Sequence, residues 1–303
     1  MSVELERESS AWLQGVSDLH IYCTPCVYAR QFDEIDMAKQ CRDVGYKAIL
    51  SKRHHCINAD AAQLATKAVP GMRVFGGVVL NWDVGGLNPI AVDSAIMLGA
   101  KEVWMPNRHA GKGSTKPIKG DIYRHNVPPR FKERPSLYTK EYPPINILTP
   151  DGRIQSSLYE IFGLVADANI ILGTGHISRQ EAMALIEVAR KSNVRKMVVT
   201  HPDPLPDSEF YWPIEDLMRV ADMGAICEFN SLRCQGWARQ WAEAIRKVGP
   251  SRCVMASGLG AWGWIHPIEG MRNFIRQMRL QGLTEKEIDM MTKEIPAKLL
   301  DID

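Results

Sequence analysis

Eight polar side chains that could carry chemistry fall at or just after the ends of predicted strands. Five of the eight histidines belong to this set, which consists of His20, Lys52, His54, His55, Asn107, His176, His201 and Glu228. Imidazole nitrogens that converge with a carboxylate are the donors that zinc, manganese or iron sites need. The set therefore predicts a metal site if the fold brings the strand ends together.

The elements that must position these side chains alternate along the chain. Strand-like runs cover residues 18–22, 46–50, 73–80, 102–105, 169–172, 196–200, 224–229 and 252–256, with helix-like segments between them. Such alternation is typical of βαβ units with a parallel sheet. It predicts one α/β domain over residues 1–303, a (β/α)8 TIM barrel, which typically needs roughly 250 residues. In this fold the loops after the strands converge on one face, where the chemistry gathers.

The composition fits a globular protein, with 45% hydrophobic and 24% charged residues. No run reaches the roughly 18 apolar residues of a membrane helix, and the first residues lack the pattern of a signal peptide. Seven cysteines, an odd number scattered through a long chain, do not suggest a disulfide framework. We therefore expect a cytoplasmic protein with no membrane partner.

A long basic insertion follows the fourth predicted strand. Between Arg108 and Lys140 there are nine basic and two acidic residues, so this segment carries +7 and the rest of the chain −5. A loop this long inside a compact domain is usually functional or disordered. We expect residues 108–146 to form a lid over an anionic small molecule or an interface, and a solvated basic surface is the alternative. Nucleic acid is not expected as a partner, because the rest of the chain is acidic.

Five short motifs at or near the predicted strand ends are Asp18-Leu19-His20-Ile21-Tyr22, Val78-Val79-Leu80-Asn81, Val84-Gly85-Gly86-Leu87-Asn88-Pro89, Gly175-His176-Ile177-Ser178 and Thr200-His201-Pro202. Together they resemble the amidohydrolase superfamily of metal-dependent hydrolases, and within it a little-characterised amidohydrolase-like family. The resemblance implies an amidohydrolase-like barrel in which His20, His176 and His201 are metal ligands. It also implies that His54 or His55 matches a histidine that related barrels carry after the second strand. A divalent zinc, manganese or iron ion there would lower the pKa of bound water and polarise a carbonyl or phosphoryl oxygen.

Two positions depart from the superfamily pattern. Tyr22 stands where the first strand normally carries a second histidine, and Gly258 stands where the eighth strand normally ends in an aspartate. Three interpretations stay open. Glu228, Tyr22 or a histidine after the second strand completes a site for one metal. Alternatively, the barrel binds no metal and carries out lyase, isomerase or lactonase chemistry, or the chain is a catalytically inactive partner of an active relative.

The first interpretation gives each candidate residue a role. His20, His176 and His201 hold one divalent metal ion, and His54 and Glu228 are the candidate catalytic groups. The substrate-binding candidates are Lys52, His55, Asn107, Tyr22, Trp262 and Trp264. The two tryptophans follow the last strand, where they could stack on a planar substrate or anchor a subunit interface. We expect a hydrolase that acts on a small anionic or cyclic substrate and forms a homo-oligomer.

Overall fold

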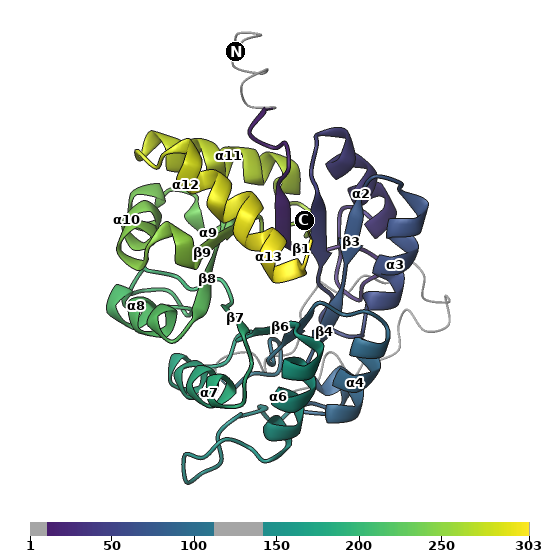
Figure 1. Ribbon diagram of the computed structural model, residues 1–303, viewed down its shortest axis with the longest axis vertical. Coiled ribbons are helices and arrows are strands. Elements are labelled where there is room, and N and C mark those ends of the chain that lie inside the picture. Colours follow the sequence, from purple (N-terminus) through teal and green to yellow (C-terminus); the bar gives the residue numbers. More distant parts are fainter. Residues whose placement is uncertain (1–10, 112–141, 303) are drawn as a thin grey trace.

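The computed structural model describes residues 11–111 and 142–302, and it shows strands with helices packed around their outside (Figure 1). The strands are β1 (Ser17–Ile21), β2 (Ala48–Ser51), β3 (Arg73–Phe75), β4 (Gly77–Val79), β5 (Glu102–Trp104), β6 (Ile171–Gly173), β7 (Lys196–Val199), β8 (Ala225–Asn230) and β9 (Cys253–Ala256). Every pairing between neighbouring strands is parallel. The predicted α/β class is therefore confirmed.

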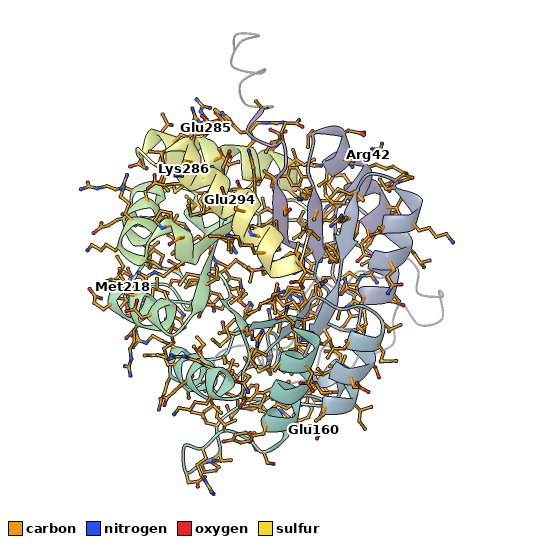
Figure 2. All side chains as sticks on the ribbon, in the orientation of Figure 1. Arg42, Glu160, Met218, Glu285, Lys286 and Glu294 are labelled. Carbon is orange, nitrogen blue, oxygen red and sulfur yellow. The ribbon has the colours of Figure 1, made fainter. Side chains whose placement is uncertain are left out.

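Helices connect these strands and cover their outer side. They are α2 (Glu34–Asp43), α3 (Ala59–Ala68), α4 (Pro89–Met97), α6 (Ser157–Ala168), α7 (Arg179–Lys191), α8 (Ile214–Asp222), α9 (Ser231–Cys234), α10 (Ala238–Val248), α11 (Pro267–Leu280), α12 (Glu285–Asp289) and α13 (Ile295–Leu300), with short 3-10 turns η1 (Trp82–Val84) and η3 (Pro250–Arg252) and a π-helical turn η4 (Met290–Glu294). Capping boxes at Ser178 and Thr284 begin α7 and α12. Charged side chains such as Arg42 and Glu160 project from the helices to the periphery (Figure 2).

The strands form two parallel sheets, one of β1 to β3 and one of β4 to β9, each in chain order. The single predicted strand 73–80 is split at Gly76, because the Asn58 side chain enters the ladder. Asn58 Oδ1 accepts a hydrogen bond from the N–H of Gly77 (2.9 Å), and its Nδ2 donates to the carbonyl oxygen of Ser51 (3.0 Å). A side-chain amide thus links β2 to β4 where backbone pairing is interrupted.

The first and last strands meet through their C-terminal ends. The N–H of Tyr22 donates to the carbonyl oxygen of Leu259 (2.9 Å). The N–H of Ser257 donates to Asp18 Oδ1 (3.0 Å). The loops that follow β1 and β9 are therefore held beside each other.

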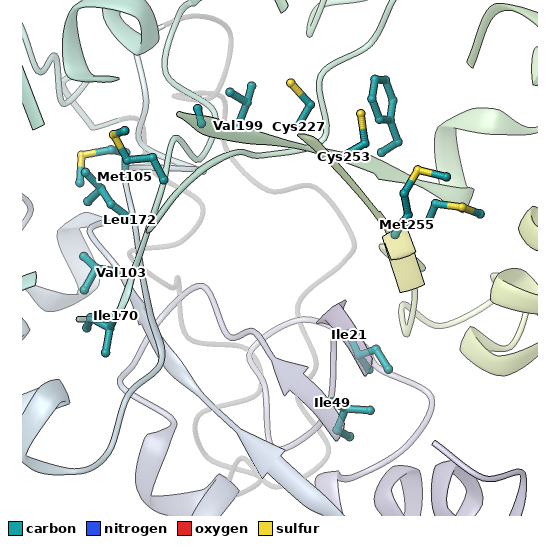
Figure 3. Packing of buried hydrophobic residues seen from close by; sticks show 14 of the residues in the cluster. Ile21, Ile49, Val103, Met105, Ile170, Leu172, Val199, Cys227, Cys253 and Met255 are labelled. Atoms are coloured by element: carbon teal, nitrogen blue, oxygen red, sulfur yellow. The ribbon is translucent and has the colours of Figure 1, made fainter. Parts of the chain in front are cut away.

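Two hydrophobic clusters pack on opposite faces of the strands. The larger one fills the space between strands and helices, and Figure 3 shows Ile21, Ile49, Val103 and other members. The smaller one joins inner-face strand residues to the C-terminal segment: Leu19, Ala48, Leu50, Val79, Trp104, Ile171, Val198, Val254, Ile295, Leu299, Leu300 and Ile302. Burial of this apolar surface is the main free-energy gain of folding. We call this smaller cluster the apolar half of the strand interior.

Residues 112–141, which make up most of the predicted basic insertion, lie outside the described residues. Within the two described ranges, no helix is long and apolar enough to cross a membrane.

Candidate functional site

A bulge or a similar irregularity in β1 positions His20. The register of β1 against β2 shifts between Asp18 and Ile21, and Asp18 Oδ1 accepts a hydrogen bond from the N–H of His20 (3.1 Å). The same oxygen accepts the bond from Ser257, and burial raises the pKa of Asp18 to about 7. Bulges re-aim side chains next to active sites. Asp18 therefore acts on the site by holding the backbone that presents His20.

A chain of three hydrogen-bonded groups runs through the His20 ring. Nδ1 of His20 lies 2.7 Å from Glu228 Oε1, and Nε2 lies 2.8 Å from the Tyr22 hydroxyl oxygen. Burial lowers the pKa of His20 well below 6.5 and raises that of Glu228 to about 8. Although the two groups are at ion-pair distance, burial favours the neutral form of both near neutral pH. The three groups can therefore relay a proton between Glu228 and Tyr22.

His176 and His201 form a second pair, after the ends of β6 and β7. Their Nε2 atoms are 2.9 Å apart, and Phe210 packs edge-on against both rings. Burial lowers the pKa of each histidine well below 6.5, so both rings are neutral near pH 7. His201 has a positive φ of 33°, a costly conformation for a residue with a side chain and one that clusters at functional sites. The His20 and His201 ring centroids are 5.7 Å apart, which brings the pair beside the chain through His20.

Lys52 lies fully buried in the same interior. Its Nζ is 4.9 Å from the centroid of the Trp104 ring. When the Asn107 amide is turned so that both of its ends are satisfied, its oxygen accepts from Lys52 Nζ (3.2 Å) and lies 3.1 Å from His176 Nε2. Burial lowers the pKa of Lys52 to about 8, and the nearby Glu228 partly opposes this shift. An amine held this way can bind an anionic group of a substrate.

The two histidines after β2 face different surroundings. The His54 ring lies 5.2 Å from the Tyr22 ring and 5.6 Å from the Tyr28 ring, between centroids. Its Nε2 is buried and has no hydrogen-bond partner among the described residues. His55 instead turns to Cys26, with 3.9 Å between its Nδ1 and Cys26 Sγ. Of the two, His54 is the one that adjoins the site.

The predicted tryptophans lie at the surface. Trp262 is 71% exposed and Trp264 is 49% exposed. Trp264 lines an outer groove whose lining includes none of the site histidines. The residues that the structure brings together are His20, Tyr22, Lys52, His54, Asn107, His176, His201 and Glu228.

Two further residues shape the site although the sequence analysis assigned them no role. The guanidinium carbon of Arg30, a buried residue, lies 4.3 Å from the Tyr22 ring centroid and 5.4 Å from that of Tyr28. Asn81 Oδ1 accepts the N–H of Asn107 (3.0 Å) and so fixes the loop after β5. Asn81 follows a predicted strand, the same signal that indicated Asn107. Arg30 lies in the middle of a loop, where no spacing marks it.

The three histidines offer nitrogen atoms of the kind that a divalent metal ion binds. No group of three or more His, Cys, Asp or Glu side chains in the described ranges is already arranged around a common point. His176 and His201 nevertheless direct two neutral nitrogens at each other, and neutral imidazole is the form that binds metal. Nδ1 of His20 contacts the carboxyl group of Glu228, and a carboxylate in this position is typical of a ligating histidine, although Nε2 of His20 contacts Tyr22. The assignment of all three as ligands stays a prediction.

The backbone at Gly258 accounts for the missing aspartate. Gly258 has a φ of +66°, and a Cβ atom added there would lie 2.6 Å from Asn230 Nδ2. A residue with a side chain would therefore be both strained and blocked at this position. The difference from the superfamily pattern at the last strand therefore involves the backbone conformation at residue 258 as well as the missing side chain.

Comparison with solved structures relates the fold to amidohydrolase-superfamily proteins. An amidohydrolase from Pseudomonas aeruginosa matches with a TM-score of 0.61 at 12% identity, over 97% of each chain. The probable dipeptidase PvdM from Pseudomonas aeruginosa matches with a TM-score of 0.66 at 9% identity, over 99% of this chain and 98% of that one. A putative 2-pyrone-4,6-dicarboxylic acid hydrolase from Pseudomonas putida gives 0.59 at 12% identity, over 95% and 97%. At such identities the likeness concerns the fold alone.

Sequence comparison gives a family without an activity. No curated protein matches the chain in sequence. One family model, described as a family of unknown function (DUF6282), matches residues 15–228. That match spans more than half of the chain and includes the residues of both histidine groups. The chain therefore belongs to the DUF6282 family.

Proposed function

We propose that this protein is a (β/α)8-barrel enzyme of the amidohydrolase type that hydrolyses a small anionic or cyclic substrate with one divalent metal ion. The observation that carries the proposal is the 2.9 Å contact between His176 Nε2 and His201 Nε2. Two neutral imidazoles that aim the same nitrogen at each other can share only one hydrogen, whereas a metal ion accepts both lone pairs. The likeness of the fold to amidohydrolases supports the same conclusion.

His176, His201 and His20 would hold the ion, and zinc, manganese and iron all accept imidazole ligands. When bound, such an ion supplies an activated water and polarises the substrate oxygen. Glu228 holds the Nδ1 side of His20, so Nε2 would be the atom that binds the ion. The ligand set is then complete without an aspartate after the last strand.

The remaining side chains bind substrate and move protons. The Lys52 amine and the Asn107 amide can hold a carboxylate or another anionic group, because they lie together in a water-poor interior. His54 has a pKa well below 6.5 because of burial, so its ring is a neutral base near pH 7. Its unpartnered Nε2 is the atom that would take up a proton from the reacting group. Tyr22, covered by Arg30, would donate a hydrogen bond to the substrate.

A second candidate function is metal-independent lyase, isomerase or lactonase chemistry. The contact that favours it is the 2.8 Å hydrogen bond between His20 Nε2 and the Tyr22 hydroxyl group. It places a tyrosine, a histidine and a glutamate in one proton relay, and such positioned groups can act as general acids and bases. In this candidate Tyr22 is the group that exchanges a proton with the substrate.

Metal analysis of purified protein tests the first candidate and separates it from the second. We expect about one ion per chain in the native protein and in His55→Ala, and loss in His176→Ala, His201→Ala and His20→Ala. His55→Ala is the matched control, because its imidazole faces Cys26 instead of the site. A native protein without metal that is active on a substrate panel, and loses that activity in Tyr22→Phe, would favour the second candidate. A folded protein with neither metal nor activity would leave the inactive-partner interpretation.

The cellular location, the oligomeric state and the ligand class of the enzyme are also proposals. We propose a cytoplasmic homo-oligomer whose ligand is a small molecule and not a nucleic acid. The basic segment 108–146 is the proposed lid or interface. Light scattering of the purified protein measures the oligomeric state directly.

A further inference from the structure

A groove on the outer surface lies apart from the site histidines and from the proposed function. It has a volume of about 910 Å³ and is formed by α9, the start of α10, residues 263–265 and the outer face of α11. These helices lie on the same side of the molecule in Figure 1. The volume falls at the upper end of the roughly 300–1,000 Å³ range of ligand pockets. It is large enough for a ligand of several rings.

Side-chain amides dominate the polar part of this groove. They are Gln235, Gln240, Asn273, Gln277 and Gln281. None of these five amide groups forms a hydrogen bond with another residue in the described ranges. Each amide offers two donors and an acceptor from the same side chain, which suits hydroxyl groups because a hydroxyl is also both donor and acceptor.

Tryptophan supplies the apolar part. Trp264 lines the groove and is 49% exposed. Trp262 and Trp237, which are 71% and 48% exposed, immediately flank lining residues in the sequence. Gln31 Nε2 donates to the carbonyl oxygen of Trp264 (2.7 Å) and so holds this loop in place. A flat aromatic face of this kind gains dispersion energy against the C–H face of a sugar ring.

The charge of the groove lining indicates which kind of hydroxyl-bearing ligand the groove would bind. Arg239 is the only charged residue in the lining, and it makes no ion pair within the described part of the chain. No acidic residue of that part lines the groove to repel an anion. A guanidinium group binds carboxylates through two parallel hydrogen bonds. Charge complementarity therefore points to a ligand with at least one carboxylate.

We propose that this groove is a binding site for an acidic oligosaccharide, that is, a short chain of sugars bearing carboxylate groups. The free amides take the hydroxyl groups, Trp264 stacks on a ring, and Arg239 takes a carboxylate. An acidic peptide supplies the carboxylate but few hydroxyl groups for five amides. A second copy of the chain would cover the tryptophans but leave the amide array unexplained.

Isothermal titration with defined sugars tests this site. The probes are hexagalacturonate, its methyl ester and maltohexaose, and the variants are Trp264→Ala and Arg239→Ala. We expect native protein to bind hexagalacturonate, and Trp264→Ala to weaken binding about tenfold, which equals roughly 1.4 kcal/mol. Arg239→Ala should bind hexagalacturonate and its ester equally, whereas native protein should prefer the acid. Trp82→Ala, a half-exposed tryptophan outside the groove, is the matched control and should leave binding unchanged.

Several results would overturn the proposal. One is the absence of heat with hexagalacturonate and with a hyaluronan hexasaccharide as a second acidic probe. Equal affinities of native and Trp264→Ala protein would place any binding elsewhere. Light scattering that shows a dimer in native protein and a monomer in Trp264→Ala would assign the groove to a second copy of the chain. Binding of poly-glutamate in place of the sugars would assign it to an acidic peptide.

Discussion

The interior of the strands has two halves that differ in chemistry although the same strands form both. Leu50 and Lys52 stand two residues apart on one face at the end of β2, and both are fully buried. Leu50 packs in the apolar half with α13, whereas Lys52 lies among the groups around His20 and Glu228. Burial stabilises the first half and shifts the pKa of groups in the second toward their neutral forms. Burial of the apolar half therefore offsets the cost of assembling the second half, which we call the polar half and which contains His20, Lys52 and Glu228.

The largest expected effect comes from breaking the apolar half. Leu50→Ala should lower the free energy of unfolding by about 2–5 kcal/mol, because it removes buried methyl groups and leaves a cavity. Urea denaturation followed by circular dichroism measures this loss. Metal content per folded chain should stay unchanged, and a loss of metal binding as large as in His176→Ala would show that the two halves are not separable.

Replacement of Lys52 in the polar half should have a smaller effect on the free energy of unfolding, and this effect should have the opposite sign. The pKa of Lys52 is lowered from 10.5 to about 8 by burial, so the unfolded chain binds the proton more tightly than the folded one. The destabilisation that Lys52 causes should therefore be lost as the pH increases from about 8 to 10.5. Lys52→Met should be more stable than native protein at pH 7, by about 1–3 kcal/mol, and this difference should shrink as the pH rises through that range.

Urea denaturation at pH 7, 8, 9 and 10 checks the prediction for Lys52. Lys191→Met, a change at an exposed lysine on α7, is the control and should follow the native pH curve. If Lys52→Met and native protein differ by the same amount at every pH, the lysine does not carry the cost assigned to it. The variant should also lose affinity for an anionic substrate.

The smallest effect is expected from removing the Tyr22 hydroxyl group, which lies at the edge of the polar half. Tyr22→Phe removes only the hydroxyl group bonded to His20 Nε2, and should change stability by about 0.5–1.5 kcal/mol. With metal at His20, the variant should retain the ion, because the ring nitrogen is released rather than lost. Metal analysis beside thermal unfolding decides this point. Loss of the ion in Tyr22→Phe would mean that the tyrosine is itself a ligand.

The sequence predicted the features of the molecule that follow a regular pattern along the chain. Alternating strands and helices, together with polar residues at strand ends, indicated the α/β class and placed His20, His176 and His201 near one another. The break at Gly76 was missed, because it depends on the side chain of Asn58 entering from a neighbouring loop. Such contacts join residues with no fixed spacing.

The same limit applies to the groove and to Arg30. The amides of the groove are spread from residue 235 to residue 281, and only the packing of α9, α10 and α11 brings them together. Arg30 reaches Tyr22 through the course of a loop rather than through a periodic pattern. The predicted lid at residues 108–146 lies largely outside the described residues and stays a prediction.

The backbone at Gly258 also constrains how this chain could change over generations. A single codon change to aspartate would place its first side-chain carbon against Asn230 on a backbone with φ of +66°. Such an intermediate would be less stable than its parent and would gain no ligand until the loop and Asn230 had also changed. Recovery of the aspartate-bearing form would therefore require coordinated changes in the loop and at Asn230.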